Sequence, residues 1–432
     1  MSDIDQQRRR FLRTAATLAT SAGVASLNIE PVEAAKSPNE KLNLGCIGVA
    51  AQGEYNLNNV ATENIVALCD IDAQRLQAAA ERFPKAAKYE DYRKLLDRED
   101  LDAIVVATPD HTHAIPTVRA LQKGLDVYCE KPLAHTVYEV RKIREWAKKQ
   151  NAVTQMGTQI HAGNNYRRVV ELIQSGAIGA VHRVHVWMSN TVQPGKRSKT
   201  SRHPDHINYD LWIGPAPMRK FDPSHFHFRW RSWWDFGGGT LADFGCHYMD
   251  LPFWALNLRH PISVEAIGSK TYQGDNETPN NMRVDYRFPA GKLNPPVHMT
   301  WYHGDLRPVW TKELKKGSGV LFEGERGRLL ADYGSNRIMM GNDEDVVVPK
   351  PTIPNSIGHH QEWIKACKSR SETTCNFDYS GALAESVLLG NVAYRAGQRF
   401  INWDGANLRS SNCPEANHLI HKEYRKGWQL EG

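Results

Sequence analysis

The stretch that most constrains this chain is residues 42–70, LNLGCIGVAAQGEYNLNNVATENIVALCD. Two short apolar runs, 42–47 and 65–69, flank a tight turn and a segment long enough for a helix. The turn, GVAAQG, places Gly48 and Gly53 at the first and third positions of a G-x-G-x-x-G pattern, and Asp70 follows Gly48 by 22 residues. This order predicts a dinucleotide-binding unit, with the pyrophosphate at the helix N-terminus and the ribose 2′-hydroxyl on Asp70.

Ala50 departs from this pattern, because it occupies the place of the second glycine. A purely structural strand-to-helix turn is the alternative, since a degenerate glycine pattern is weak evidence when it stands alone. The flanking strands and the position of Asp70 favour nucleotide binding. Asp70 and Asp72 would also repel a 2′-phosphate, so we expect NAD, with NADP less favoured.

Composition and charge exclude several other classes of protein. The chain has 432 residues, of which 41% are hydrophobic and 24% charged, as expected for a soluble enzyme of two domains. The net charge is +6, but basic and acidic residues are interspersed along the chain, so we expect no nucleic-acid partner. No apolar run is long enough to span a bilayer. The seven scattered cysteines include no C-x-x-C pair, which argues against a disulfide framework or a zinc cluster.

The N-terminal segment resembles an export signal. Arg8 and Arg9 are followed by Phe11, Leu12 and a mildly apolar stretch, as in twin-arginine signals, and a small-residue cleavage site ends at Ala34. We therefore expect residues 1–34 to be a signal peptide and the mature protein to be periplasmic or secreted. A disordered basic tail is the alternative.

After Asp70, strand and helix patterns alternate up to about residue 159, which predicts a doubly wound parallel sheet and a nucleotide-binding domain over residues 41–159. The clearest buried strand is 101–108, and Pro109-Asp110-His111-Thr112-His113 follows it, where such sheets bind ligands. The H-x-H pair could suggest a metal, but no further ligand cluster lies nearby. We predict no metal and expect the histidines to position the substrate or the nicotinamide.

The next strand, 126–129, ends in Glu130-Lys131-Pro132. A lysine at the end of a buried strand has its ammonium where the cofactor should lie, and partial desolvation would lower its pKa toward useful proton transfer. A surface ion pair between Glu130 and Lys131 is the alternative.

Together with the nucleotide unit, the segments ATPDHTH and YCEKPLA resemble the glucose-fructose oxidoreductase and inositol dehydrogenase family (Gfo/Idh/MocA). The resemblance runs from residue 41 to at least 250. It implies that Lys131 lies beside the nicotinamide and contacts the substrate. Asp110 stands where relatives often carry asparagine, which leaves its role open.

The remaining chain, 160–432, predicts a second domain of α+β type. Residues 181–188, VHRVHVWM, alternate strictly, and 262–270, 281–288, 296–301, 319–323 and 328–331 also have strand patterns, so we expect a largely antiparallel open sheet. Helices on one face of such a sheet would leave the other face for a partner, which predicts a homo-oligomer.

Aromatic residues and arginines dominate the segment HFHFRWRSWWDFGGG. Flat rings and guanidinium groups suit the face and hydroxyls of a sugar, so Arg229, beside Arg231, and Trp233 and Trp234 are candidate substrate contacts. For each tryptophan, packing beneath a loop is an equally strong alternative.

Asp243, His247 and Asp250 are spaced so that they share one face of a helix begun by Thr240. An aspartate one turn before a histidine can orient the imidazole and stabilise its protonated form, although a structural pair is the alternative. The D-x-x-x-H pattern after a glycine run also resembles the catalytic element of the family. The resemblance implies a catalytic group of Lys131, Asp243 and His247.

These patterns predict an exported NAD-dependent oxidoreductase that acts on a carbohydrate or polyol hydroxyl with a tightly bound cofactor. A redox-neutral glycoside hydrolase or epimerase that uses NAD transiently is the alternative, and a non-catalytic sugar-binding module would require a broken site. The residues expected to contact the cofactor are Gly48, Val49, Gly53, Asp70, Thr108, Pro109, His113, Glu130 and Gln159.

Overall fold

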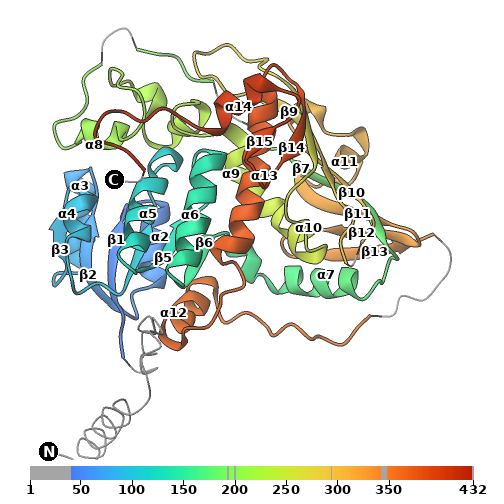
Figure 1. Ribbon diagram of the computed structural model, residues 1–432, viewed down its shortest axis with the longest axis horizontal. Helices are drawn as coiled ribbons and strands as arrows, with labels where there is room; N and C mark the ends of the chain where they lie inside the picture. Colours follow the sequence, from blue (N-terminus) through green and yellow to red (C-terminus); the bar gives the residue numbers. More distant parts are fainter. Residues whose placement is uncertain (1–39, 192–193, 199–200, 293, 342–347, 431–432) are drawn as a thin grey trace, which may run out of the picture. The chain divides into compact units, whose positions relative to one another are not determined.

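The computed structural model describes residues 40–191, 194–198, 201–292, 294–341 and 348–430, and these belong to one compact unit with two sheets (Figure 1). The predicted signal peptide, residues 1–34, lies outside the described residues. In the described part of the chain, no helix combines the length and the apolar character needed to cross a bilayer.

The first sheet is entirely parallel and has the strand order β3-β2-β1-β4-β5-β6, which is that of a Rossmann fold. The predicted doubly wound sheet is thus confirmed. Only the three-residue strand β3 was not predicted. The strands are β1 Asn43–Ile47, β2 Asn64–Cys69, β3 Ala87–Tyr89, β4 Ala103–Val106, β5 Asp126–Glu130 and β6 Thr154–Gly157.

Helices alternate with these strands, and local capping fixes where they begin. The Asp72 carboxylate accepts hydrogen bonds from the first-turn amides of α3, and Thr136 and Glu139 form the predicted capping box of α6. The helices of this half are α2 Gln52–Asn59, α3 Ala73–Arg82, α4 Tyr92–Leu96, α5 Ala114–Gln122 and α6 Val137–Lys149, with 3₁₀ turns η2 Asp110–Thr112 and η3 Gln159–Ala162.

Side chains of the parallel strands alternate between two cores. On β4, Ile104 and Val106 pack with Val118 of α5 in one core, whereas Val105 packs in the other core with Trp363. Trp363 belongs to α12 (His359–Ser369), so a helix from the last fifth of the chain covers one face of the nucleotide-binding sheet.

The second sheet has nine strands in the order β13-β12-β11-β7-β10-β9-β8-β14-β15. Only β7 and β10 pair in parallel, so the sheet is mixed but mostly antiparallel, which confirms the predicted class. The short strands β13 to β15 were not predicted. The strands are β7 Val181–Met188, β8 Ser263–Ser269, β9 Asn281–Phe288, β10 Val297–His303, β11 Ser318–Gly324, β12 Gly327–Ala331, β13 Asn336–Met340, β14 Phe400–Asp404 and β15 Arg409–Ser410.

Helix α13, Phe377–Arg395, joins the two halves of the unit (Figure 1). It is buried along most of its length and packs on α6 of the first half and on α9 and β8 of the second. The other elements are α7 Asn164–Gln174, α8 Tyr209–Ile213, η4 Pro223–His225, η5 His227–Ser232, α9 Gly239–Tyr248, α10 Asp250–Ala255, η6 Gly304–Leu306, α11 Val309–Glu313 and α14 Pro414–Ile420.

Candidate active site

Two glycines allow the turn after β1 to close tightly. Gly48 has φ +83°, and a Cβ atom there would lie 2.5 Å from the carbonyl oxygen of Ala107. A Cβ atom at Gly53 would lie 2.1 Å from the carbonyl oxygen of Gly48. Because neither position has room for a side chain, both require glycine. Ala50, which replaces the second glycine of the pattern, lines the cleft beside this turn.

Asp70 fixes this turn from the end of β2. Its Oδ2 accepts a hydrogen bond from the amide of Val49 at 3.0 Å, and its Oδ1 accepts one from the amide of Asp72 at 3.0 Å. Burial raises the pKa of the carboxyl, and the two amide donors oppose that shift. Asp70 also lines the cleft, at the end of β2 where the ribose of a dinucleotide is expected.

The cleft at the carboxyl ends of β1, β2 and β4 has a volume of about 1190 Å³, measured out to its open mouth. Thr108 and Pro109 line it, as do Trp230 and Arg231 from η5. Its far wall includes Trp428, near the C-terminus, whose ring lies 4.9 Å below the Arg93 guanidinium carbon. The glycine turn, the acid and the helix N-terminus fit the pyrophosphate and ribose of NAD.

Sequence reasoning missed Trp428, because the tail has no periodic pattern. It also left unassigned the partner of Arg231, which is Asp243.

Lys131 and Asp243 form a close ion pair between the two halves of the unit. The Lys131 Nζ donates to Asp243 Oδ1 at 2.6 Å and to its carbonyl oxygen at 2.8 Å. Arg231 Nε lies 3.1 Å from the same Oδ1. Burial would raise the pKa of Asp243, but the Lys131 ammonium and the Arg231 guanidinium outweigh it and hold this pKa well below its usual range. Asp243 is therefore a carboxylate at any physiological pH.

The predicted relation between Asp243 and His247 is wrong. The Asp243 carboxylate is occupied by Lys131 and Arg231, and the His247 Nδ1 is buried without a hydrogen-bond partner among the described residues. Burial and the Lys131 ammonium lower the pKa of His247 to about 3, against a weaker opposing effect of Asp243. The imidazole is therefore neutral near pH 7 and is available as a proton acceptor.

Asp250 does not share the helix face of Asp243. Helix α9 ends at Tyr248, and Asp250 begins α10. Its buried carboxylate lies 2.9 Å from His161 Nδ1 and accepts a hydrogen bond from the Tyr379 hydroxyl at 2.7 Å. These contacts hold α10 to η3 and α13, so Asp250 has a structural role.

Glu130 and Gln159 contact each other, and the expected contact of each with the cofactor stays a prediction. The buried Glu130 Oε1 accepts hydrogen bonds from Gln159 Nε2 at 2.8 Å, Asn56 Nδ2 at 2.9 Å and Gln52 Nε2 at 3.1 Å. Burial raises the pKa of this carboxyl, and the donors around it oppose that shift. Because the network ties the end of β5 to the first turn of α2, these residues position Lys131 and the glycine turn.

His113 contacts two segments of the protein, and its expected contact with the cofactor stays a prediction. Its two ring nitrogens lie 2.8 Å from the carbonyl oxygen of Pro132 and 2.7 Å from that of Thr108. Burial lowers the pKa of the ring to about 4. The ring thus connects the segment after β4 to the segment that carries Lys131. His111 Nε2 contacts the carbonyl oxygen of Trp212, and the described residues contain no group of three or more metal-ligating side chains.

The three candidate substrate residues lie in different parts of the structure. Trp233 is fully buried and donates its indole N–H to the carbonyl oxygen of Ser224 at 2.8 Å, so its assignment to the substrate was wrong and the packing alternative holds. Trp234 lies at a different hollow, with the Arg395 guanidinium 5.0 Å from its ring. Of the three candidate substrate residues, Arg229 alone lines the hollow that contains Asp243.

That hollow has a volume of about 930 Å³ out to its mouth, and Thr240 of α9 also lines it. Phe228 and Arg231 line both this hollow and the cofactor cleft. The two spaces therefore meet at Phe228 and Arg231, and Arg231 Nε lies 3.1 Å from Asp243 Oδ1. A substrate in the hollow and a nicotinamide in the cleft would adjoin at these residues.

Comparison with known proteins agrees with this geometry. Residues 42–158 match the NAD-binding Rossmann fold of an oxidoreductase family, and residues 163–430 match the C-terminal alpha/beta domain of the same family. The chain belongs to the Gfo/Idh/MocA oxidoreductase family. This family is one of oxidoreductases whose Rossmann fold binds NAD.

Curated relatives match mainly in the nucleotide-binding half. An inositol 2-dehydrogenase of Salmonella paratyphi B is 33% identical over 150 residues, which cover 33% of this chain and 45% of the relative. A glycosyl hydrolase family 109 protein of Shewanella pealeana is 27% identical over 198 residues, which cover 40% of this chain and 43% of the relative. The chain thus spans about half the length of these relatives.

Solved structures share the fold over a larger part of the chain. The WlbA dehydrogenase from Bordetella pertussis, in complex with NADH and UDP-GlcNAcA, has a TM-score of 0.63 at 18% identity and covers 84% of this chain and 99% of its own. The aldose-aldose oxidoreductase from Caulobacter crescentus has a TM-score of 0.61 at 17% identity and covers 84% of this chain and 100% of its own.

Proposed function

We propose that this protein is an exported oxidoreductase that oxidises a hydroxyl of a carbohydrate or polyol and keeps its NAD bound through turnover. The observation that carries this proposal is the Lys131–Asp243 pair, 2.6 Å apart. Asp243 lines the second hollow and lies 3.1 Å from Arg231, which lines both that hollow and the cofactor cleft. Relatives named as inositol 2-dehydrogenases support a polyol or sugar as the substrate.

The chain supplies the groups that such an oxidation requires. Gly48, Gly53 and Asp70 would hold NAD, which accepts a hydride from the carbinol carbon when it is bound. The Lys131 ammonium can donate to the substrate oxygen while Asp243 fixes its position. The neutral His247 can accept the hydroxyl proton, because its lowered pKa leaves it unprotonated near pH 7.

The C-terminal segment supports retention of the cofactor. Figure 1 shows it returning from α14 past α8 toward α5. Lys422 Nζ donates to the carbonyl oxygen of His111 at 3.2 Å, and Arg425 Nε donates to that of Gly214 at 2.9 Å. These contacts place Trp428 in the wall of the cleft, where it would hinder release of a bound nucleotide.

Export adds a second reason for retention. The segment with Arg8 and Arg9 resembles a signal of the twin-arginine route, which carries folded proteins. A cofactor enclosed in the cytoplasm could not be exchanged outside it. Each hydride taken from a substrate would then have to be returned, either to a second substrate or to the same sugar.

The deciding experiment uses the purified full chain without added nucleotide. Small molecules released on denaturation are identified by mass spectrometry, and the native protein is incubated in deuterated water with a panel of sugars, polyols and glycosides. We expect NAD to be released, and product to form only when a second sugar or another acceptor is present.

Other results would replace the proposal. Repeated turnover with deuterium beside the oxidised carbon would identify a redox-neutral hydrolase or epimerase. Steady NADH formation that depends on added NAD would refute retention of the cofactor. Export is tested separately by cell fractionation, where changing Arg8 and Arg9 to lysine should leave the protein in the cytoplasm.

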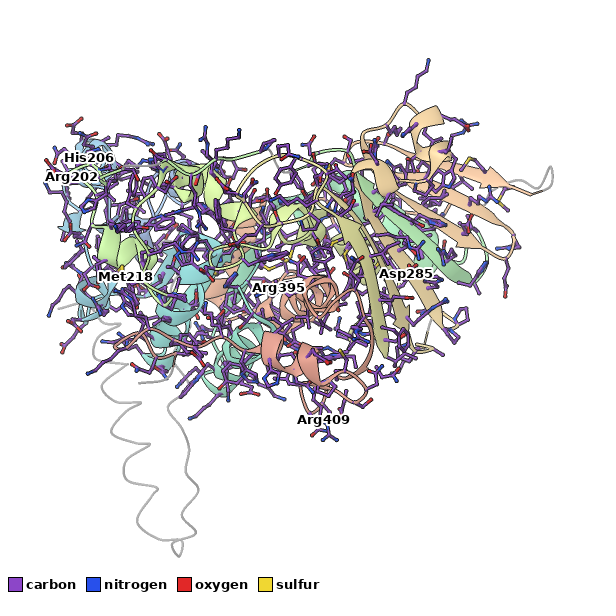
Figure 2. All side chains as sticks on the ribbon, turned by 90° about the horizontal axis from the view of Figure 1, so that it is seen from above. Arg202, His206, Met218, Asp285, Arg395 and Arg409 are labelled. Atoms are coloured by element: carbon purple, nitrogen blue, oxygen red, sulfur yellow. The ribbon has the colours of Figure 1, made fainter. Side chains whose placement is uncertain are left out.

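The proposed assembly is a homo-oligomer formed through the sheet face opposite the helices. That face carries residues of both charges, with Asp285 Oδ1 2.7 Å from His298 Nε2 and Asp285 Oδ2 2.8 Å from Arg283 Nε (Figure 2). A face with mixed charges can complement itself across a two-fold axis. Light scattering coupled to size exclusion should give a mass above 48.8 kDa, and a monomer would refute this assembly.

A further inference from the structure

The hollow beside Asp243 has an excess of positive charge. Among the described residues that line it, Asp243 is the only acid, whereas Arg229 and Arg231 are both cationic. The Lys131 ammonium, 2.6 Å from the Asp243 carboxylate, adds a third cation. Three cations and one carboxylate leave a local charge of about +2, in a space partly shielded from solvent where such a charge is weakly screened.

Asp110 does not cancel this excess. It is 5% exposed and lies near Arg231, Lys131 and Asp243. Burial raises its pKa to about 8, and the two cations only partly oppose that effect. The carboxyl is therefore mostly protonated at pH 7 and contributes little negative charge.

The two arginines differ in what they can offer a ligand. Arg229 is exposed and forms no ion pair with the described residues. Arg231 uses Nε for Asp243, but its Nη1 is buried without a hydrogen-bond partner in the described part of the chain. Because this donor is buried, a ligand in the hollow cannot reach it. Arg231 therefore contributes its positive charge, and Arg229 is the arginine that can donate to a ligand.

Aromatic side chains contact Arg231 and line the hollow. The Arg231 guanidinium carbon lies 4.3 Å from the ring centre of Trp230 and 5.5 Å from that of Phe228, so the guanidinium contacts both rings. Phe228 is 66% exposed and lines the hollow, where its ring can cover the apolar face of a pyranose.

We propose that this hollow selects a carbohydrate that carries a carboxylate, and that Arg229 is the residue that recognises the acid group. A neutral sugar would leave two positive charges uncompensated. A carboxylate can accept a pair of parallel hydrogen bonds from a guanidinium, which a hydroxyl cannot. The inference rests on the proposed function, because it names the substrate class of the same site.

The test compares matched ligands on the full-length holoenzyme. Methyl glycosides of gluco, galacto and manno configuration are offered as the 6-carboxylate, the neutral 6-hydroxyl parent and the neutral 6-amide. The rate at which each reduces the bound cofactor is measured in single turnovers, and binding is measured by calorimetry. We expect the carboxylates to have at least about tenfold higher efficiency than either neutral form, equivalent to 1.4 kcal/mol.

Arg229→Gln should abolish this preference, while its cofactor content and melting temperature stay at the wild-type values because Arg229 is exposed. Arg409→Gln is the matched control. It removes the same charge from an exposed side chain on β15, outside the hollow (Figure 2), and should keep the preference. Added salt should reduce the advantage of the carboxylates and leave the neutral sugars unaffected.

Several outcomes would overturn the inference. Equal efficiency of acids and neutral sugars in the wild type would remove the acid specificity. A preference that survives Arg229→Gln would remove the role of Arg229, and a stronger preference for sugar 6-phosphates would replace the carboxylate. If no sugar reduces the cofactor but the carboxylates bind about tenfold more tightly, the proposed function fails and the inference stands. If binding shows no preference either, both fail.

Discussion

Asp110→Asn should stabilise this protein, and the gain should grow with pH. Asp110 is 5% exposed, and burial raises its pKa from the ordinary 3.8 to about 8, against the opposing effects of Arg231 and Lys131. Between these two values the folded state binds a proton that the unfolded state releases. The free energy of unfolding therefore falls as pH rises through this range. Asparagine has nearly the same shape and binds no proton, so the free energy of unfolding of the variant does not fall for this reason as pH rises.

The size of the effect follows from the same two values. Each pH unit between them changes the free energy of unfolding by about 1.4 kcal/mol. From pH 5 to pH 8 the free energy of unfolding of the variant should thus rise by about 4 kcal/mol relative to that of the wild type. Above pH 8 the difference should level off, because Asp110 then ionises in the folded protein as well.

The assay is urea unfolding of both proteins at several pH values from 5 to 9, with the difference between them plotted against pH. All other titrating groups are common to the two proteins, so their contributions largely cancel in the difference. A difference that does not change with pH would show that Asp110 ionises normally in the fold. A variant that becomes relatively less stable as pH rises would show that the carboxylate is the favoured form.

Three further predictions concern the cofactor and the chemistry. Lys131→Ala and His247→Ala should each lower turnover by about a hundredfold or more while the NAD content of the purified protein is unchanged; wild-type rates would exclude the residue from the mechanism. Gly53→Ala should abolish NAD retention because its Cβ atom would lie 2.1 Å from a carbonyl oxygen. Gly334→Ala is the control, since a Cβ atom there has no neighbour within 4 Å, and this variant should retain NAD. Mass spectrometry of the released nucleotide measures both. Trp428→Ala should speed NAD release in a dilution assay, and an unchanged rate would remove this residue from the wall that retains the cofactor.

The sequence predicted most of the framework because local patterns carry it. Residues 281–288 alternate strictly and residues 181–188 alternate in part, and both segments occur as strands with those bounds. The capping signals of Asp72 and of Thr136 with Glu139 also act as predicted, since they depend on residues within one turn. Strands β3 and β15 have three and two residues, so they offered too short a pattern to detect.

The chemistry of the site was harder to predict, because it depends on contacts between segments far apart in sequence. Lys131 and Asp243 are 112 residues apart, and Arg231 reaches the same carboxylate from η5. Helical spacing alone placed Asp243 next to His247. It could not show that two cations already neutralise the aspartate.

The wall of the cofactor cleft is also formed by segments that lie far apart in the sequence. Asp70 comes from the first sheet, Arg231 from η5, and Trp428 from a segment within a few residues of the C-terminus. The cleft thus reaches its final form only when the C-terminal segment has docked through Lys422 and Arg425. We therefore expect NAD to bind before or during this last step and to be held by it. Such an order of events would suit a protein that leaves the cytoplasm already folded, because the step that completes the fold would also enclose the cofactor.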